Sequence, residues 1–263
     1  MRPDYKNWVP SKLIAALAAG CAACFALALL FAAGGLNINA SLRACLTALF
    51  GAGFLVCLFF TFKSIAWRRA FDYNGTRQLS RHITEGVAAF VEIPDGGVGL
   101  DVGCGSGALT IACAKRNPKA EMVGLDRWGR EYKPYSRELC ESNAAAEGVG
   151  NIRFVQGDAT RLDFPDESFD AVVSNYVYHN ITGADKQALL LETLRVLRPG
   201  GLFAIHDIMS PMRYGDMRLF AENLRKAGYK EVSLIPTDDG RFMSKREARS
   251  LSLSGSTLLF GRK

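Results

Sequence analysis

The first 70 residues of this 263-residue chain almost lack acidic side chains: they hold one Asp or Glu against seven Lys and Arg. The remaining residues hold 25 of each sign, so the net charge of +6 comes from the first quarter alone. A nucleic-acid partner would need basic residues spread over a folded domain, so we exclude one. Only nine prolines and 22% charged residues likewise exclude a disordered chain. The positive charge instead predicts contact with a membrane.

The cysteines do not form the pattern of a disulfide framework. Four lie inside apolar stretches and three are scattered through the remainder: Cys21, Cys24, Cys45 and Cys57, then Cys104, Cys113 and Cys140. Cys21 and Cys24 have the spacing of a redox or metal-binding pair, but their uncharged surroundings would solvate neither a thiolate nor a metal ion. We interpret them as structural, and the cysteine usage indicates a reducing, cytosolic compartment for most of the chain.

Two long uncharged runs, residues 13–33 and 44–62, occupy the first quarter. At a rise of about 1.5 Å per residue, helices of these lengths span roughly 28–31 Å, which matches the hydrocarbon core of a bilayer. The short polar segment 34–43 separates them, so two spans would form a hairpin. Arg43 is the one basic residue of that segment, and the other six flank the outer ends. The positive-inside rule therefore places both ends in the cytoplasm.

Two other interpretations of these runs are weaker. A cleaved signal peptide has an apolar core of about 7–15 residues and no second span directly after it. Buried helices of a soluble protein would show polar faces, which both runs lack. Small residues recur four apart, which favours close helix packing in lipid: Ala16, Gly20 and Cys24, then Ala44, Ala48 and Ala52. We expect a two-pass membrane hairpin in residues 1–70 and a cytoplasmic domain in residues 71–263, which places the protein in the cell membrane.

From residue 98 onward, short apolar runs alternate with amphipathic patterns. The runs predict five buried parallel strands at 98–102, 122–126, 152–156, 171–175 and 202–207, then two final strands at 231–235 and 256–260. The amphipathic patterns predict helices at 77–90, 108–116, 135–147, 185–197 and 216–227. This order predicts an α/β fold with helices on both faces of a mostly parallel sheet.

A glycine-rich segment, residues 101–107, follows the first of these strands and opens a helix. Glycines let the backbone bend sharply and approach a ligand, while the first N–H groups of the helix face the site. Gly103, Gly105 and Ala108 also satisfy the G-x-G-x-x-G/A dinucleotide fingerprint. Asp126, an acid about 20 residues further on, fits that motif as well. A nicotinamide-dependent oxidoreductase is therefore one alternative at this point.

Three further features argue against a nicotinamide cofactor. Asp101 stands two residues before the first glycine, where a carboxylate can hold an ammonium group. Gly157, Asp158 and Ala159 end the third strand, with an acid placed for an amine donor such as the adenine N6. The segment 194–201, Leu-Arg-Val-Leu-Arg-Pro-Gly-Gly, then links the fourth helix to the fifth strand.

Together these motifs, over about residues 75–228, resemble the class I S-adenosylmethionine-dependent methyltransferases, especially the small-molecule branch that includes ubiquinone and menaquinone methyltransferases. The resemblance implies a Rossmann-like, seven-stranded sheet whose last strand is antiparallel, with S-adenosyl-L-methionine as cofactor. The cofactor-binding residues that it implies are Asp101, Gly103, Cys104, Gly105, Gly107, Asp126, Arg127, Trp128, Gly157, Asp158, Ala159 and Asn175.

The resemblance also gives these residues separate roles. Asp101 and the glycine segment would hold the methionine moiety, and Asp126 would accept both ribose hydroxyls. Asp158 and Ala159 would contact the adenine, while Asn175 would line the floor near the sulfonium. Trp128 would either cover the adenine face or pack structurally.

Catalysis of methyl transfer needs in-line alignment and exclusion of water, and a base only when the acceptor is a weak acid. His179 is the best general-base candidate, and its alternative role is that of a hydrogen-bonded loop histidine. His206 and Asp207 offer only two metal ligands, so we expect no metal. A membrane hairpin beside a charge-neutral domain predicts a small, lipophilic acceptor. A non-catalytic, cofactor-binding membrane scaffold is the third alternative.

Overall fold

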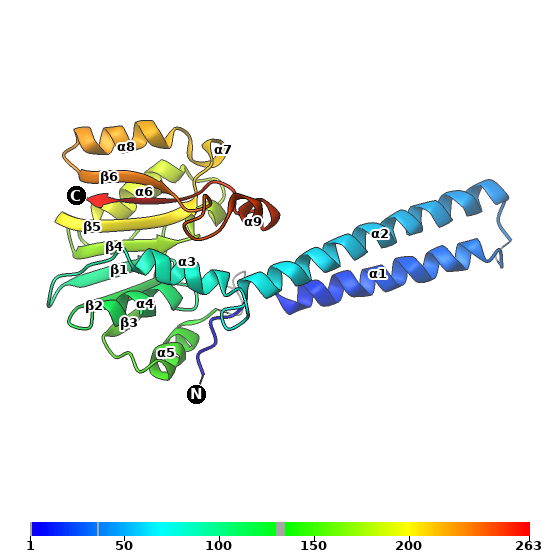
Figure 1. Cartoon of the computed structure of the whole chain (residues 1–263), viewed down its shortest axis with the longest axis horizontal. Helices are drawn as coiled ribbons and strands as arrows, with labels where there is room; N and C mark the ends of the chain where they lie inside the picture. Colours follow the sequence, from blue (N-terminus) through cyan, green and yellow to red (C-terminus); the bar gives the residue numbers. More distant parts are fainter. Residues whose placement is uncertain (1, 36, 130–134) are drawn as a thin grey trace. The chain divides into compact units, whose positions relative to one another are not determined.

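The computed structural model describes residues 2–35, 37–129 and 135–263, which separate into two compact units (Figure 1). The smaller unit is Asn7–Ser80, and the larger joins Met1–Lys6 to Arg81–Lys263. This division falls ten residues after the boundary expected at residue 70, because the second long helix continues through its basic residues to Phe71. The Ser80 hydroxyl then donates to the Phe71 carbonyl at 2.7 Å, which ties residues 72–80 to that helix.

The smaller unit is a helical hairpin of α1, Ser11–Ala32, and α2, Ala40–Phe71. Both helices are long and apolar enough to cross a membrane. The Asn39 side chain accepts a hydrogen bond from the Leu42 N–H at 2.8 Å, so α2 begins four residues before the apolar run. At the other end the Arg68 guanidinium donates to the Val9 carbonyl at 2.6 Å, which closes the base of the hairpin.

Small residues do bring the two helices together, although not all of those expected. Gly20 faces the Cys57 thiol, and Gly53 faces the Cys24 thiol, so Gly20 and Cys24 were correctly predicted. The rings of Phe31 and Phe50 stack beside them with centroids 5.6 Å apart. Ala16 and the expected stripe on α2 are exposed instead: Ala44, Ala48 and Ala52. The four-residue spacing of small residues did not by itself predict which face of α2 packs against α1, because Phe50 also contributes to that contact.

The larger unit contains a seven-stranded sheet in the order β3-β2-β1-β4-β5-β7-β6. The strands are β1 Val98–Val102, β2 Glu121–Asp126, β3 Ile152–Gln156, β4 Phe169–Asn175, β5 Leu197–Ile208, β6 Lys230–Pro236 and β7 Ser256–Arg262. The first five are parallel, while β7 runs antiparallel to both β5 and β6. The predicted Rossmann-like, seven-stranded and mostly parallel sheet, with its last strand antiparallel, is therefore confirmed.

The helices of the larger unit lie close to their expected positions. The five predicted helices are present with these observed bounds: α3 Leu79–Ala88, α4 Ala108–Arg116, α5 Arg137–Ala146, α6 Lys186–Arg195 and α8 Met217–Lys226. Among the described residues, three short helical segments were not predicted: a 3₁₀ turn at Tyr178–Asn180, α7 at Pro211–Tyr214 and α9 at Lys245–Ser250. Each is too short to show a helical repeat of apolar residues.

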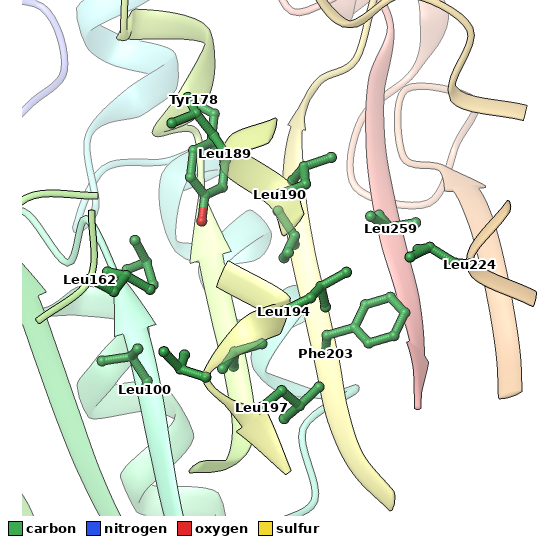
Figure 2. Close-up of a cluster of buried hydrophobic side chains, with 14 of the residues drawn as sticks. Leu100, Leu162, Tyr178, Leu189, Leu190, Leu194, Leu197, Phe203, Leu224 and Leu259 are labelled. Atoms are coloured by element: carbon green, nitrogen blue, oxygen red, sulfur yellow. The ribbon is translucent and has the colours of Figure 1, made fainter. Parts of the chain in front are cut away.

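The sheet is covered on both faces, which explains why its strands are apolar without interruption. On one face, strand residues pack against α6 and α8, as Figure 2 shows for Leu100, Phe203 and Leu259 beside Leu190, Leu194 and Leu224. On the other face, α3 and α4 cover Met122, Ala204 and Leu258. Alternate residues of β5 thus belong to opposite cores.

Strand β5 begins five residues before the predicted strand, at the end of the predicted helix. Leu197 pairs with Phe169 of β4, and the register then shifts so that Leu202 pairs with Ala171. The Pro-Gly-Gly segment lies within this irregular part, where Gly200 has a φ of +79°. Pairing with β4, which local sequence does not record, therefore outweighs the helical pattern here.

Candidate active site

The strand order of the sheet reverses between β1 and β4. From β1 the chain first builds outward to β2 and β3, and it later returns to the other side of β1 with β4. In open α/β sheets, ligands bind beyond the strand ends at this reversal of strand order. Asp101, Asp126, Asp158 and Asn175 stand at or directly after four neighbouring strand ends. The structure therefore brings the main predicted site residues to one edge.

The glycine loop, residues 103–107, is tied to the end of β2. The N–H groups of Gly103 and Cys104 both donate to the Leu125 carbonyl, at 2.7 and 3.0 Å. Gly103 has a φ of +76°, and a side-chain carbon there would lie 2.4 Å from Val177. At Gly105, by contrast, the same position has no atom within 4 Å. Gly105 is thus the point at which a ligand can approach the loop backbone.

Asp126, the predicted ribose-binding residue, connects the glycine loop to the segment after β2. Its two carboxylate oxygens accept the N–H groups of Gly105 and Trp128, each at 2.9 Å. The Trp128 indole N–H in turn donates to the Gly105 carbonyl at 3.0 Å. Each carboxylate oxygen retains a second lone pair, so Asp126 can accept two more donors. The indole is held by the loop, while Arg127 is exposed.

Asp101 is buried with a single neutral side chain as its hydrogen-bond partner. Its side chain accepts the Thr110 hydroxyl at 2.6 Å, and the residue is 1% exposed. Burial and, to a lesser degree, the Asp126 charge raise the pKa of Asp101 to about 7, although hydrogen bonds from Thr110 oppose them. A carboxylate in this position would be stabilised by a cationic group. Burial also raises the pKa of the neighbouring Cys104 thiol, which is therefore protonated.

The third strand end contributes Gly157, Asp158 and Ala159. The Gly157 N–H donates to the Asp126 carbonyl at 3.0 Å, which places this segment directly beside the ribose candidate. Asp158 accepts the Thr160 N–H at 2.8 Å, and hydrogen bonds from Thr160 lower the pKa of its carboxyl group. Ala159 packs against the core. Asp158 is half-buried, and one of its carboxylate oxygens is held in a turn.

Asn175 is held by His206, which is itself held by Thr237. His206 Nδ1 donates to Asn175 Oδ1 at 2.8 Å, and His206 Nε2 accepts the Thr237 hydroxyl at 2.8 Å. Burial lowers the pKa of His206 to about 3, so this histidine is neutral. Sequence analysis did not identify Thr237, because β5 and the segment after β6 are distant in sequence. His206 therefore orients an amide at the site.

His179 and Asp207 form a hydrogen-bonded pair beside this network. His179 Nδ1 donates to Asp207 Oδ1 at 2.5 Å, and the His179 backbone N–H donates to Asp207 Oδ2 at 3.1 Å. Asp207 is fully buried, whereas the His179 side chain is 17% exposed. Burial raises the pKa of Asp207, but the hydrogen bonds that it accepts from His179 and the Ile208 N–H outweigh burial and keep this pKa below the usual range. The pair leaves Nε2 of His179 as the acceptor.

Two tyrosines lie beside this pair, and the sequence assigned a separate role to neither of them. Tyr176 has a φ of +56°, and its ring lies edge-on to His206 and His179, with centroids 4.7 and 5.9 Å away. The Tyr214 hydroxyl is buried near Asp207; burial and the Asp207 charge raise the pKa of Tyr214. Among the described residues it is the one buried side-chain polar atom without a hydrogen-bond partner. Non-glycine residues at positive φ often mark functional sites.

The neighbours His206 and Asp207 do not converge on a common point. Adjacent strand residues face opposite sides of a sheet, and here His206 contacts Asn175 and Thr237 while Asp207 contacts His179. Within residues 2–35, 37–129 and 135–263, no group of three His, Cys, Asp or Glu side chains gathers as a metal site.

Known proteins resemble this chain over the part that carries the site. Residues 100–205 match the family model of a methyltransferase domain. A demethylmenaquinone methyltransferase of Geobacillus kaustophilus is 31% identical over 150 residues, which cover 56% of this chain and 61% of that protein. Another, of Deinococcus radiodurans, is 38% identical over 112 residues, which cover 43% of each chain. This chain thus spans about half the length of the curated relatives that it matches.

The fold resembles that of solved structures as well. The crystal structure of the cyclase SpnF has a TM-score of 0.53 to this chain, with 20% sequence identity. The match covers 73% of this chain and 85% of that one. At this level of identity the likeness concerns the fold.

The raised pKa of Asp101 predicts a pH-dependent stability. Ionising this carboxyl costs the folded state more than the unfolded state, so its contribution is lost as the pH rises from about 4 to 7. Asp101→Asn cannot ionise and should gain about 1.4 kcal/mol over the wild type per pH unit between pH 5 and 7. Thermal unfolding of the full chain in detergent, at pH 5 and pH 8 without cofactor, measures this difference.

The matched control is Asp158→Asn, because Asp158 is less buried than Asp101 and its pKa is lowered instead of raised. Its stability relative to the wild type should stay constant between pH 5 and 8. Parallel pH profiles for the wild type and Asp101→Asn would show that Asp101 is ionised throughout.

Proposed function

We propose that this chain, which resembles the class I methyltransferases, transfers a methyl group from S-adenosylmethionine to a small, lipophilic acceptor at the cytoplasmic face of a membrane. One observation carries the proposal: three acids stand at consecutive strand ends around a glycine loop with an open side. These acids are Asp101, Asp126 and Asp158.

The residues of the crevice fit S-adenosylmethionine. Asp101, which is buried and has no cationic partner among the described residues, would hold the ammonium of the methionine moiety. Asp126 has two free lone pairs for the ribose hydroxyls, and Asp158 has a free oxygen for the adenine amine. When bound, the cofactor supplies an electrophilic methyl group on a sulfonium. This set of acids favours it over a nicotinamide dinucleotide, for which a buried acid at Asp101 has no partner.

His179 and Asp207 supply the base that a weakly acidic acceptor requires. Asp207 fixes the imidazole with its Nδ1–H inward, so Nε2 accepts a proton from the acceptor hydroxyl. The buried carboxylate stabilises the imidazolium that forms. A deprotonated hydroxyl is a stronger nucleophile at oxygen and, on an aromatic ring, at the neighbouring carbon. The proposed acceptor is therefore a lipophilic molecule with an acidic hydroxyl.

The hairpin supports the lipophilic character of the acceptor. Its outer surface carries exposed apolar side chains such as Leu49, Leu55 and Phe62, which a bilayer would cover. Its basic ends favour a cytoplasmic catalytic domain. A domain tethered to the membrane works where a bilayer-dissolved acceptor is concentrated. The relatives named demethylmenaquinone methyltransferases support the same class of acceptor.

The first test concerns the acceptor. The full chain in lipid vesicles, given S-adenosylmethionine labelled in the methyl group, should label the organic extract of vesicles that contain a demethylated quinol. Asp101→Asn should abolish this labelling. Label found only in water-soluble metabolites would overturn the lipophilic acceptor, and cofactor binding with no turnover at all would favour a non-catalytic scaffold.

The second test concerns the base. Asp207→Asn and His179→Gln should lower kcat at least tenfold, because both remove proton acceptance by an oriented imidazole. The dissociation constant for S-adenosylmethionine should stay within twofold. His82→Gln, at an exposed histidine of α3, is the control and should leave kcat unchanged. Equal kcat for wild type and His179→Gln would return His179 to a structural role.

A further inference from the structure

Residues 4–6, which we call the strap, belong to the catalytic unit although they precede the membrane hairpin. Tyr5 is 5% exposed, and the segment runs beside α5 (Figure 1). In sequence, the hairpin therefore lies between the strap and the rest of the catalytic unit. We infer that the strap is part of the cofactor site and acts on the glycine loop through Asn143, a positioning residue. The inference rests on the proposed use of S-adenosylmethionine.

Asn143 connects the strap to the loop directly. Its Oδ1 accepts the Asp4 backbone N–H at 2.7 Å, and its Nδ2 donates to the Asp4 carbonyl at 3.1 Å. The same Nδ2 donates to the Ser106 carbonyl, inside the glycine loop, at 3.0 Å. Asn143 is 2% exposed, so no solvent replaces these partners. Both amide hydrogens are used, and the strap therefore fixes the amide in the one orientation that also binds the loop.

Helix α5 carries the rest of the connection on the same face. One turn before Asn143, the Cys140 thiol donates to the Gly105 carbonyl at 3.2 Å. One turn after it, Glu147 accepts the Tyr5 hydroxyl at 3.1 Å and also pairs with Lys115 of α4. Burial raises the pKa of Glu147, but the hydrogen bonds from Lys115 and Tyr5 lower it below its usual range. The strap is thus held at two points on α5.

Loss of the strap would leave the Asn143 amide buried without its two hydrogen bonds to the Asp4 backbone. A buried polar group without partners turns toward others, so the Ser106 carbonyl would lose its fixed donor. The loop would then hold its backbone less firmly, and cofactor binding would have to order it. A chain segment continuous with the first membrane helix therefore contributes to cofactor affinity.

The test is a double-mutant cycle on the full chain in detergent, with S-adenosylmethionine affinity measured by calorimetry. Asn143→Ala and Tyr5→Ala should each raise the dissociation constant at least fivefold. The double variant should be no weaker than the weaker single variant, because both act through one connection. Asp4→Ala is the control: it keeps the backbone groups that Asn143 binds, and its affinity should stay within twofold.

A second readout does not depend on the cofactor. Amide hydrogen exchange in residues 103–107 should be faster in Tyr5→Ala than in the wild type and unchanged in Asp4→Ala. A lower melting temperature with unchanged loop exchange and unchanged affinity would reduce the strap to a structural role and overturn the inference. If loop exchange is faster in Tyr5→Ala than in the wild type, but the wild type binds no S-adenosylmethionine, the proposed function alone would be overturned.

Discussion

Parallel strands that end at one edge of a sheet place their carboxyl-terminal residues side by side, and the whole site depends on this constraint. It brings the acids of β1, β2 and the loop after β3 around the glycine loop. Asp126 then ties this edge together, because its carboxylate accepts the N–H groups of both Gly105 and Trp128. Contacts within the protein therefore link the site residues to one another, and a ligand would add donors to this network.

The sequence predicted well whatever depends on local pattern. Strands β1 and β3 and helix α4 have the predicted ends, because continuous apolar runs and glycine-rich turns mark them. The positions of the site acids could be predicted because these acids lie at or just after the ends of predicted strands. The contact of His179 with Asp207 could not be predicted, because it depends on the register between β4 and β5. Asn143 shows no sequence signal, since its partner Asp4 lies 139 residues away.

The hairpin and the catalytic unit share more than one chain connection. The chain leaves the catalytic unit after the strap and returns to it at residue 81. A simple removal of the first 70 residues would therefore remove Asp4 and Tyr5 as well as the hairpin. Lost activity in such a truncated chain would combine two effects, so the acceptor is best studied with the full chain in lipid.

The central claim is that this edge of the sheet binds S-adenosylmethionine, and calorimetry on the full chain tests it most directly. We predict micromolar binding of S-adenosylmethionine, no detectable binding of NAD or NADP, and an affinity at least tenfold lower in Asp126→Ala. The loss follows because each hydrogen bond to a charged group contributes about 1.5–3 kcal/mol. Binding of a nicotinamide dinucleotide in place of S-adenosylmethionine, or an unchanged dissociation constant in Asp126→Ala, would contradict the account.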